Sequence, residues 1–98
     1  MKLALEFAGG SQTLVKNQSR HEIELEDGKE WLMSDLLDWI LQNLLVDCST
    51  PDLLIKDGNV RPGILVLVND TDWELLGNVD TVISEGDTVT FLSTLHGG

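Results

Sequence analysis

The sequence predicts an α+β fold in which one main helix packs across a mixed sheet of four to five strands. Apolar and polar residues alternate over 2–7 and again over 21–26, which is the period of a strand with one buried face. One amphipathic segment follows at 34–45, and an apolar segment at 64–68 and a last strand at 88–95 come after it. A helix with one apolar side needs a sheet face against which to bury that side.

The first quarter of the chain predicts a β-hairpin with a long connection. Residues 8–11 contain two glycines and read as a turn, after which Leu14 and Val15 are expected to begin the return strand. The residues expected to point into the core from this hairpin are Leu3, Leu5, Phe7, Ile23 and Leu25.

The helix is expected to begin at Ser34, whose side chain can cap it, and to end before Pro51, because the residue preceding proline disfavours helical geometry. Trp39 falls among the polar positions, so it either packs under a neighbouring loop or contacts a partner. The apolar positions cover one side of the helix and are Leu36, Leu37, Ile40, Leu41, Leu44 and Leu45.

The second half predicts a short turn at 53–55, a strand at 64–68, a turn at 69–72, a short extended piece at 73–76 and the last strand. In that last strand the alternation directs Val89 and Phe91 inward and Leu92 outward. Because the strand 64–68 is apolar at every position, we expect its second face either to be covered by another part of the protein or to bind a partner. We therefore expect a partner patch made of Leu92, Ile64, Val66 and Val68 together with Trp39.

This order of elements has a compact solution in which the first and last strands lie side by side and parallel, with the helix crossing diagonally in a right-handed connection. That is the β-grasp architecture. It makes residues 1–94 the folded domain and leaves the end of the last strand projecting from the sheet. The remaining residues, Leu95-His96-Gly97-Gly98, would form a flexible tail.

A double glycine can thread into the narrow active site of another enzyme, since no side chain widens it. On this hypothesis the reactive group is the α-carboxylate of Gly98. The enzyme recognises the tail through Leu95, His96 and Gly97. The alternative is that the two glycines are incidental.

Composition limits the function classes. The formal net charge of −11 opposes binding to nucleic acid and favours partners with basic surfaces. There is no phosphate loop, HExxH, CxxC or nucleophile elbow, and the acidic residues are scattered, so we expect no catalytic residue, no metal site and no intrinsic cofactor. Cys48, the one cysteine, is not expected to act as a nucleophile, because His21 and His96 lie in segments with other roles.

Neither a secretory signal nor an apolar run of about 18 residues is present, which predicts a protein of the cytoplasm, or also of the nucleus, without a membrane partner.

Three stretches carry a family resemblance: Val60–Asp70 running into Asp72–Gly77, the segment Leu92–Gly98, and Asp35–Ile40 within the helix. Together they resemble the ubiquitin-related modifier family over nearly the whole chain. The resemblance implies a ubiquitin-like β-grasp fold.

The resemblance further implies that an E1-like enzyme uses ATP and magnesium to adenylate the terminal glycine, which corresponds to Gly98. A rhodanese-type domain of that sulfurtransferase would then form a thiocarboxylate, whose sulfur serves 2-thiolation of wobble uridine in tRNA. It also implies conjugation to lysines of target proteins.

Two other readings stay open. One is a small-subunit sulfur carrier of molybdopterin or thiamine synthesis, which shares the fold and the double glycine. The other is a non-covalent ubiquitin-like binding module.

Overall fold

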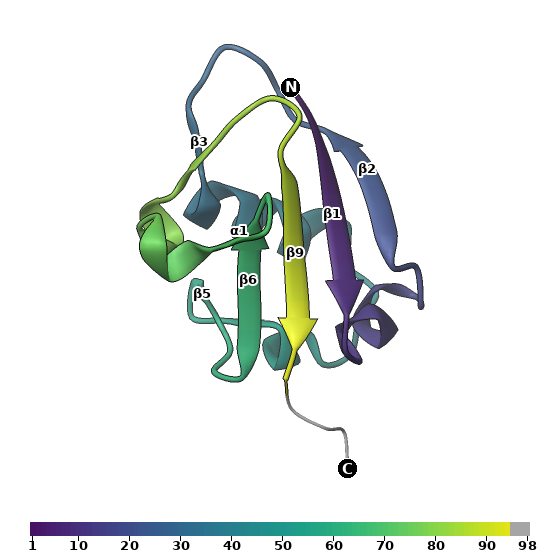
Figure 1. The fold of residues 1–98 in the computed structure, drawn as a ribbon. Helices are drawn as coiled ribbons and strands as arrows, with labels where there is room; N and C mark the ends of the chain where they lie inside the picture. The colour runs from purple at the N-terminus through teal and green to yellow at the C-terminus, as the bar shows by residue number, and fades with distance from the viewer. Residues whose placement is uncertain (95–98) are drawn as a thin grey trace.

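A computed structural model describes residues 1–94 (Figure 1). Its centre is a five-stranded sheet in the order β2-β1-β9-β6-β7, so the first and last strands are neighbours. β1 and β9 run parallel, while the other neighbouring pairs are antiparallel. The bounds of these strands are Lys2–Ala8 for β1, Arg20–Glu24 for β2, Ile64–Val68 for β6, Thr71–Asp72 for β7 and Thr88–Ser93 for β9. The predicted mixed sheet and its central parallel pair are confirmed.

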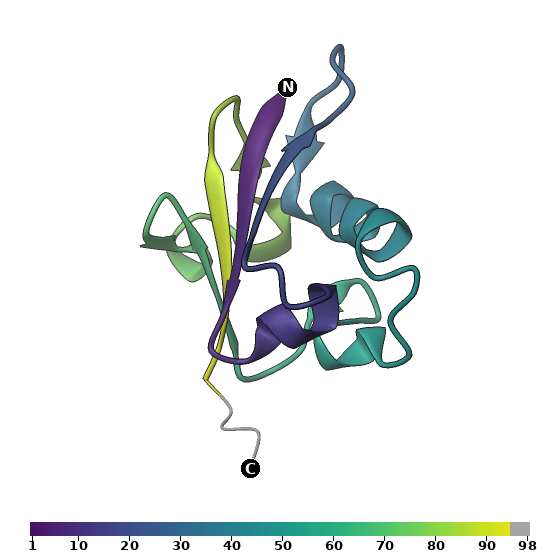
Figure 2. The same ribbon diagram turned by 90° about the vertical axis from the view of Figure 1, so that its right-hand side faces the viewer.

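The helix α1, Met33–Asn43, covers one face of the sheet and leaves the other face open (Figure 2). It begins one residue earlier than expected and is not capped by Ser34. The carboxylate of Asp35 instead accepts the Leu32 backbone N–H at 2.9 Å, which satisfies a donor at the helix start. The helix ends well before Pro51, as predicted. No helix within residues 1–94 is long and apolar enough to cross a membrane.

The core lies between α1 and the sheet. Phe7 of β1 stacks on Phe91 of β9 with ring centroids 5.3 Å apart and planes 14° from parallel. Leu36, Leu37 and Ile40 of the helix are fully buried against this layer. The inward direction predicted for the alternating strands and for the helix is therefore confirmed.

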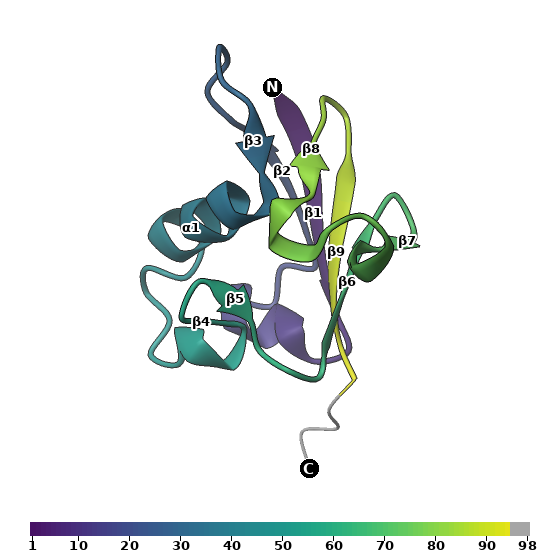
Figure 3. The ribbon, with the colours of Figure 1, turned by 90° about the vertical axis from the view of Figure 1, so that its left-hand side faces the viewer.

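Two small ribbons complete the domain (Figure 3). β3 (Trp31–Leu32) pairs antiparallel with β8 (Val82–Ile83), and β4 (Ile55–Lys56) pairs antiparallel with β5 (Asn59–Val60). A 3₁₀ helix, η2 (Pro51–Leu53), precedes β4. Of the three residues expected to form a turn here, Leu54 and Ile55 are buried in the core, whereas Leu53 is exposed.

Two expectations for strands were wrong. Leu14 and Val15 lie in a 3₁₀ helix, η1 (Ser11–Val15), and the return strand begins only at Arg20. The segment after β6 is a short strand, β7, followed by the 3₁₀ helices η3 (Trp73–Leu75) and η4 (Asn78–Asp80). The Asp72 carboxylate accepts the Glu74 N–H at 2.9 Å, and this cap with the burial of Trp73 favours a helical turn over an extended segment.

The beginning of β1 is tied to the chain that follows β2. The Met1 amine donates to the Leu25 carbonyl at 2.9 Å and to the Asp27 carboxylate at 2.7 Å. The hydrogen bond to Asp27 raises the pKa of this amine above its usual value. The N-terminal end of β1 is thereby fixed at the end of the sheet opposite to the exit of β9 (Figure 1).

Candidate functional site: the exit of the last strand

β9 lies between β1 and β6 and leads directly to the predicted tail (Figure 1). The tail residues singled out in the sequence, Leu95, His96, Gly97 and Gly98, lie outside the described residues. What the structure describes is the root of the tail, from Phe91 to Thr94. We call the groups that hold this root the exit clamp, namely Gly9, Ser11, Gly63 and Thr94.

Ser11 holds the root from the side of β1. Its hydroxyl lies 2.8 Å from the Phe91 carbonyl oxygen and 2.9 Å from the Ala8 carbonyl oxygen, and its side chain is buried. A buried hydroxyl without a partner would be costly, so this side chain ties the turn after β1 to β9. Sequence reasoning missed Ser11, and the only signal was a small polar residue following Gly9 and Gly10.

Gly9 packs against the same root. Its φ is +68°, and a Cβ placed there would overlap the Ser93 carbonyl oxygen and lie 2.9 Å from Leu92 Cδ1. Glycine is therefore required here both for its backbone conformation and for the close approach of the two chains.

Thr94 holds the root from the side of β6. Its backbone N–H donates to the Gly63 carbonyl at 2.8 Å, and its hydroxyl donates to the same oxygen at 2.6 Å. The clamp thus contacts the chain from the side of β1 and from the side of β6, immediately before residue 95. The hydroxyls of Ser11 and Thr94 and the backbone of β6 therefore fix the position of the last described residue, Thr94.

The clamp contains no His, Cys or charged side chain. Elsewhere in residues 1–94, His21 Nε2 lies 2.8 Å from the Gln18 carbonyl oxygen and its ring meets Phe7 edge-on at 5.5 Å. Cys48 is half-buried after α1, with its sulfur 3.9 Å from the Thr50 hydroxyl. The described residues bring no three His, Cys, Asp or Glu side chains together as a metal site.

The predicted partner patch needs correction. Val66 and Val68 are buried, pairing with Phe91 and Val89 on the face that α1 covers, and Ile64 shares that face and packs on the core. They cannot form an exposed patch with Leu92. The leucines that share the open face with Leu92 are Leu65 and Leu67, each half-buried.

Trp39 also lies away from the open face. It is half-buried on α1 and packs against the core from the covered side of the sheet. The structure therefore separates Trp39 from Leu92, and the two do not form one surface.

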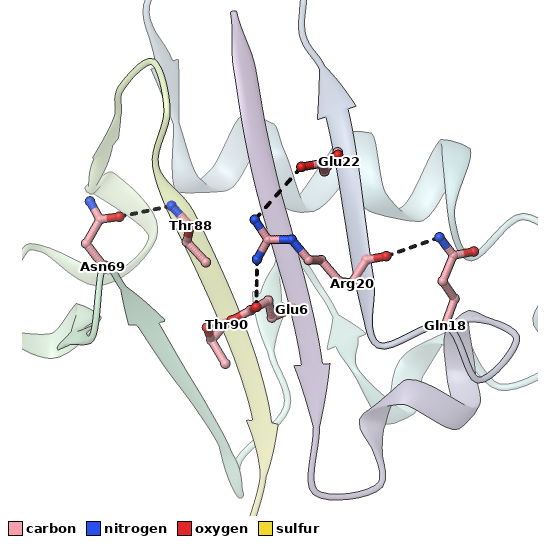
Figure 4. A network of polar contacts seen from close by, with 7 residues as sticks. All are labelled: Glu6, Gln18, Arg20, Glu22, Asn69, Thr88 and Thr90. Carbon is pink, nitrogen blue, oxygen red and sulfur yellow. Dashed lines mark hydrogen bonds and ion pairs between the residues drawn. The ribbon is translucent and has the colours of Figure 1, made fainter.

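Beside the three leucines the open face is polar (Figure 4). The Arg20 guanidinium reaches from β2 across to β1, 2.7 Å from the Glu6 carboxylate and 4.0 Å from that of Glu22. The Thr90 hydroxyl lies 3.4 Å from the other oxygen of Glu6. A partner that docks on this face meets leucines over β6 and β9 and charged groups over β1 and β2.

The replacement Gly9→Ala is expected to lower the free energy of unfolding by about 2 kcal/mol and to move the amide resonances of residues 91–94. The cause is the added Cβ, which must push Ser93 and Leu92 aside. Chemical denaturation and amide NMR measure the two effects.

The matched control is Gly58→Ala, since Gly58 has a φ of +77° but open space where the Cβ would lie. Equal destabilisation by the two replacements would contradict the role of close contact at Gly9.

Comparison with known proteins identifies relatives along the full length of the chain. Residues 2–98 match the family model described as Urm1 (Ubiquitin related modifier). A ubiquitin-related modifier 1 homolog of Drosophila simulans is 47% identical over all of this chain and 95% of the relative, and homolog 1 of Arabidopsis thaliana is 45% identical over all of both chains.

A solved structure shares the fold. The solution structure of Urm1 from Trypanosoma brucei superposes with a TM-score of 0.76 at 39% identity, covering 99% of this chain and 95% of that one. The β-grasp arrangement, the match across 2–98 and the identity to these relatives agree. The chain belongs to the ubiquitin-related modifier family.

Proposed function

We propose that this protein is a sulfur carrier whose Gly98 carboxylate is adenylated by an E1-like enzyme and converted to a thiocarboxylate, which donates sulfur for 2-thiolation of wobble uridine in tRNA. The observation that carries the proposal is membership of the family over residues 2–98, a match that includes the terminal glycines. The carrier is a substrate in this chemistry and not its catalyst.

The chemistry requires activation because a carboxylate is a poor electrophile. An oxygen of Gly98 attacks the α-phosphate of ATP and pyrophosphate leaves, which makes an acyl-adenylate. A persulfide sulfur on the enzyme then displaces AMP, and a thiol cleaves the resulting acyl disulfide to release the thiocarboxylate. ATP and magnesium belong to the enzyme, and this chain needs no cofactor of its own.

The exit clamp supports such a transfer. Fully extended, residues 95–98 would reach about 14 Å beyond Thr94. Because Thr94 is bonded to Gly63 and Ser11 reaches Phe91, the tail starts from a fixed point. An enzyme that binds the domain would therefore find the carboxylate within a limited region, and this lowers the entropy cost of bringing the reacting groups together.

In this proposal Leu95, His96 and Gly97 are the part of the tail that the enzyme reads. The absence of a side chain at Gly97 keeps the tail narrow, and Leu95 sets its register in the channel. The net charge of −11 favours an enzyme with a basic docking surface and disfavours direct contact with tRNA by this chain. The reaction would take place in the cytoplasm, or also in the nucleus.

The same activated carboxylate can also be attacked by a lysine amine of a target protein, giving an isopeptide bond. The family name, which includes the word modifier, supports this second role. The molybdopterin or thiamine carriers and the non-covalent module are less well supported, because the family match covers almost the whole chain.

Intact mass spectrometry tests the proposal directly. The protein is incubated with the activating enzyme, ATP and a sulfur donor, and the expected product is heavier by the difference between one sulfur and one oxygen. The control omits ATP. If a competent enzyme leaves only the unmodified mass, the sulfur-carrier proposal is wrong.

A further inference from the structure

The edge of β2 carries unpaired backbone groups. The ladder between β1 and β2 is flanked by hydrogen bonds between odd-numbered residues. The Phe7 N–H donates to the Ser19 carbonyl, and the Leu25 N–H donates to the Met1 carbonyl. In an antiparallel pair, alternate residues face the partner strand, so Arg20, Glu22 and Glu24 direct their backbone N–H and C=O groups away from the sheet. β2 is an edge strand, and no other strand within residues 1–94 pairs with its outer side.

At the Arg20 end of this edge, the outward-facing carbonyl already has a hydrogen-bond donor. The side-chain amide of Gln18 donates to the Arg20 carbonyl at 3.1 Å (Figure 4). Within residues 1–94 the backbone groups of Glu22 and Glu24 that face outward have no comparable partner, and both residues are exposed. The open part of the edge can therefore form hydrogen bonds with one short extended segment.

Acidic and apolar side chains alternate along this edge. Glu22 and Glu24 lie on the open face, and Ile23 between them points to the side of α1, half-buried at the margin of the core. A shallow depression of about 490 Å³ lies on the open face beside this edge, and Lys2, Ala4 and Thr88 line it together with Glu22 and Glu24. The edge itself offers two carboxylates with an apolar position between them.

The neighbouring cations only partly neutralise these carboxylates. Arg20 is 4.0 Å from Glu22 but only 2.7 Å from Glu6, which is its main partner. Lys2 lies directly opposite Glu24 in the ladder without forming an ion pair with it. The local charge of the edge remains negative.

A second copy of this chain is a poor occupant. Pairing the open part of β2 with itself, centred on Glu22 or Ile23, would place glutamates of the two copies opposite one another. Like charges directly opposite one another destabilise a ladder. Each copy would also bring a net charge of −11. The partner that fits is instead a basic one.

We propose that the β2 edge binds an extended segment of a partner protein with the pattern basic–apolar–basic, added as a further antiparallel strand. Residues opposite each other in a ladder point to the same face, so the two basic side chains lie beside Glu22 and Glu24. The apolar residue between them points toward Ile23. The backbone hydrogen bonds supply attraction, and the side chains supply selectivity. This binding does not use Gly98 and is independent of the proposed sulfur transfer.

A labelled peptide containing Lys-Val-Lys tests the proposal by fluorescence anisotropy against the full chain. Two comparison peptides are needed: one with Glu-Val-Glu, and one in which the backbone nitrogens of both lysines are methylated. Methylation keeps the charge but removes the N–H groups that would donate to the carbonyls of Glu22 and Glu24. Each change is expected to weaken binding by about tenfold or more.

The protein variants are Glu22→Lys with Glu24→Lys, and the matched control Asp52→Lys with Asp57→Lys. Both pairs change the net charge equally, but the control lies near the β4–β5 ribbon. Only the first pair is expected to reduce affinity by about tenfold or more. Amide NMR of the complex is expected to show shifts and slower hydrogen exchange at Glu22 and Glu24.

Several results would overturn the proposal. They are equal affinity for the methylated peptide, equal loss in the two variants, NMR shifts confined to Leu65 and Leu67, self-association of the chain through β2, or no saturable binding. Equal affinity for the methylated peptide would mean that charge attraction, and not strand addition, holds the peptide.

Discussion

Removal of Gly98 is expected to lower the rate of adenylate formation with the activating enzyme and ATP by about a hundredfold or more. The shortened chain still ends in a carboxylate, that of Gly97, but one residue of extended chain spans about 3.5 Å. The root of the tail is held by Thr94 and Gly63, so the domain cannot simply slide forward to compensate. Pyrophosphate release measures the rate.

The variant Gly98→Ala serves as the length-matched control, since it keeps the carboxylate at the same reach and adds only a Cβ. We expect it to lose less activity than the deletion. Thermal unfolding should be the same for both variants and the parent chain, because the described core residues lie between Leu3 and Phe91. An unchanged rate of adenylate formation after the deletion would refute the role of Gly98.

The replacement Phe91→Ala is expected to lower the free energy of unfolding by about 3–5 kcal/mol. Phe91 is completely buried and stacks on Phe7 in the centre of the sheet, so the deletion leaves a cavity that the paired strands cannot close. A domain of this size is stable by only about 5–15 kcal/mol, so the loss is a large share of the total. Urea denaturation measures it.

Leu75→Ala is the matched control for Phe91→Ala, because Leu75 is 79% exposed and its truncation removes little buried area. It should change the free energy of unfolding by about 0.5 kcal/mol or less. A loss at Phe91 no larger than the loss at Leu75 would show that the stacked pair does not hold the sheet together.

Much of the fold followed from the sequence because strands with one buried face carry a period. In β1, the apolar residues Leu3, Leu5 and Phe7 alternate with less apolar ones, and α1 has one apolar side. The spacing of the apolar residues therefore predicts both the type of each of these elements and the side that faces the core. The parallel neighbours β1 and β9 then followed from the order of the elements.

For strand β6, the spacing of apolar residues does not predict which face is buried. All five of its residues are apolar, so the alternation that identifies the buried face is missing. The choice is made by the register with β9, which places Val66 beside Phe91 and Leu65 beside Leu92. A shift of one residue would exchange the two faces, and the sequence has no local feature that excludes it.

The exit clamp could not be predicted for a different reason. Its contacts join residues far apart in the chain, such as Ser11 and Phe91, and they use backbone oxygens that every residue possesses. The glycines at 9 and 63 indicated turns, but not that the first of these turns packs against Ser93. The tail was recognisable in the sequence, while the contacts that hold residues 91–94 were not.

The pairing of β1 with β9 also has a consequence for biosynthesis. Glu6 and Thr90 face each other although they are 84 positions apart, so the central ladder cannot form until β9 has been made. A product that stops short of β9 lacks the strand between β1 and β6, and such a fragment is expected to remain unfolded and open to proteolysis. A stable domain is therefore expected only after β9 has been added to the chain.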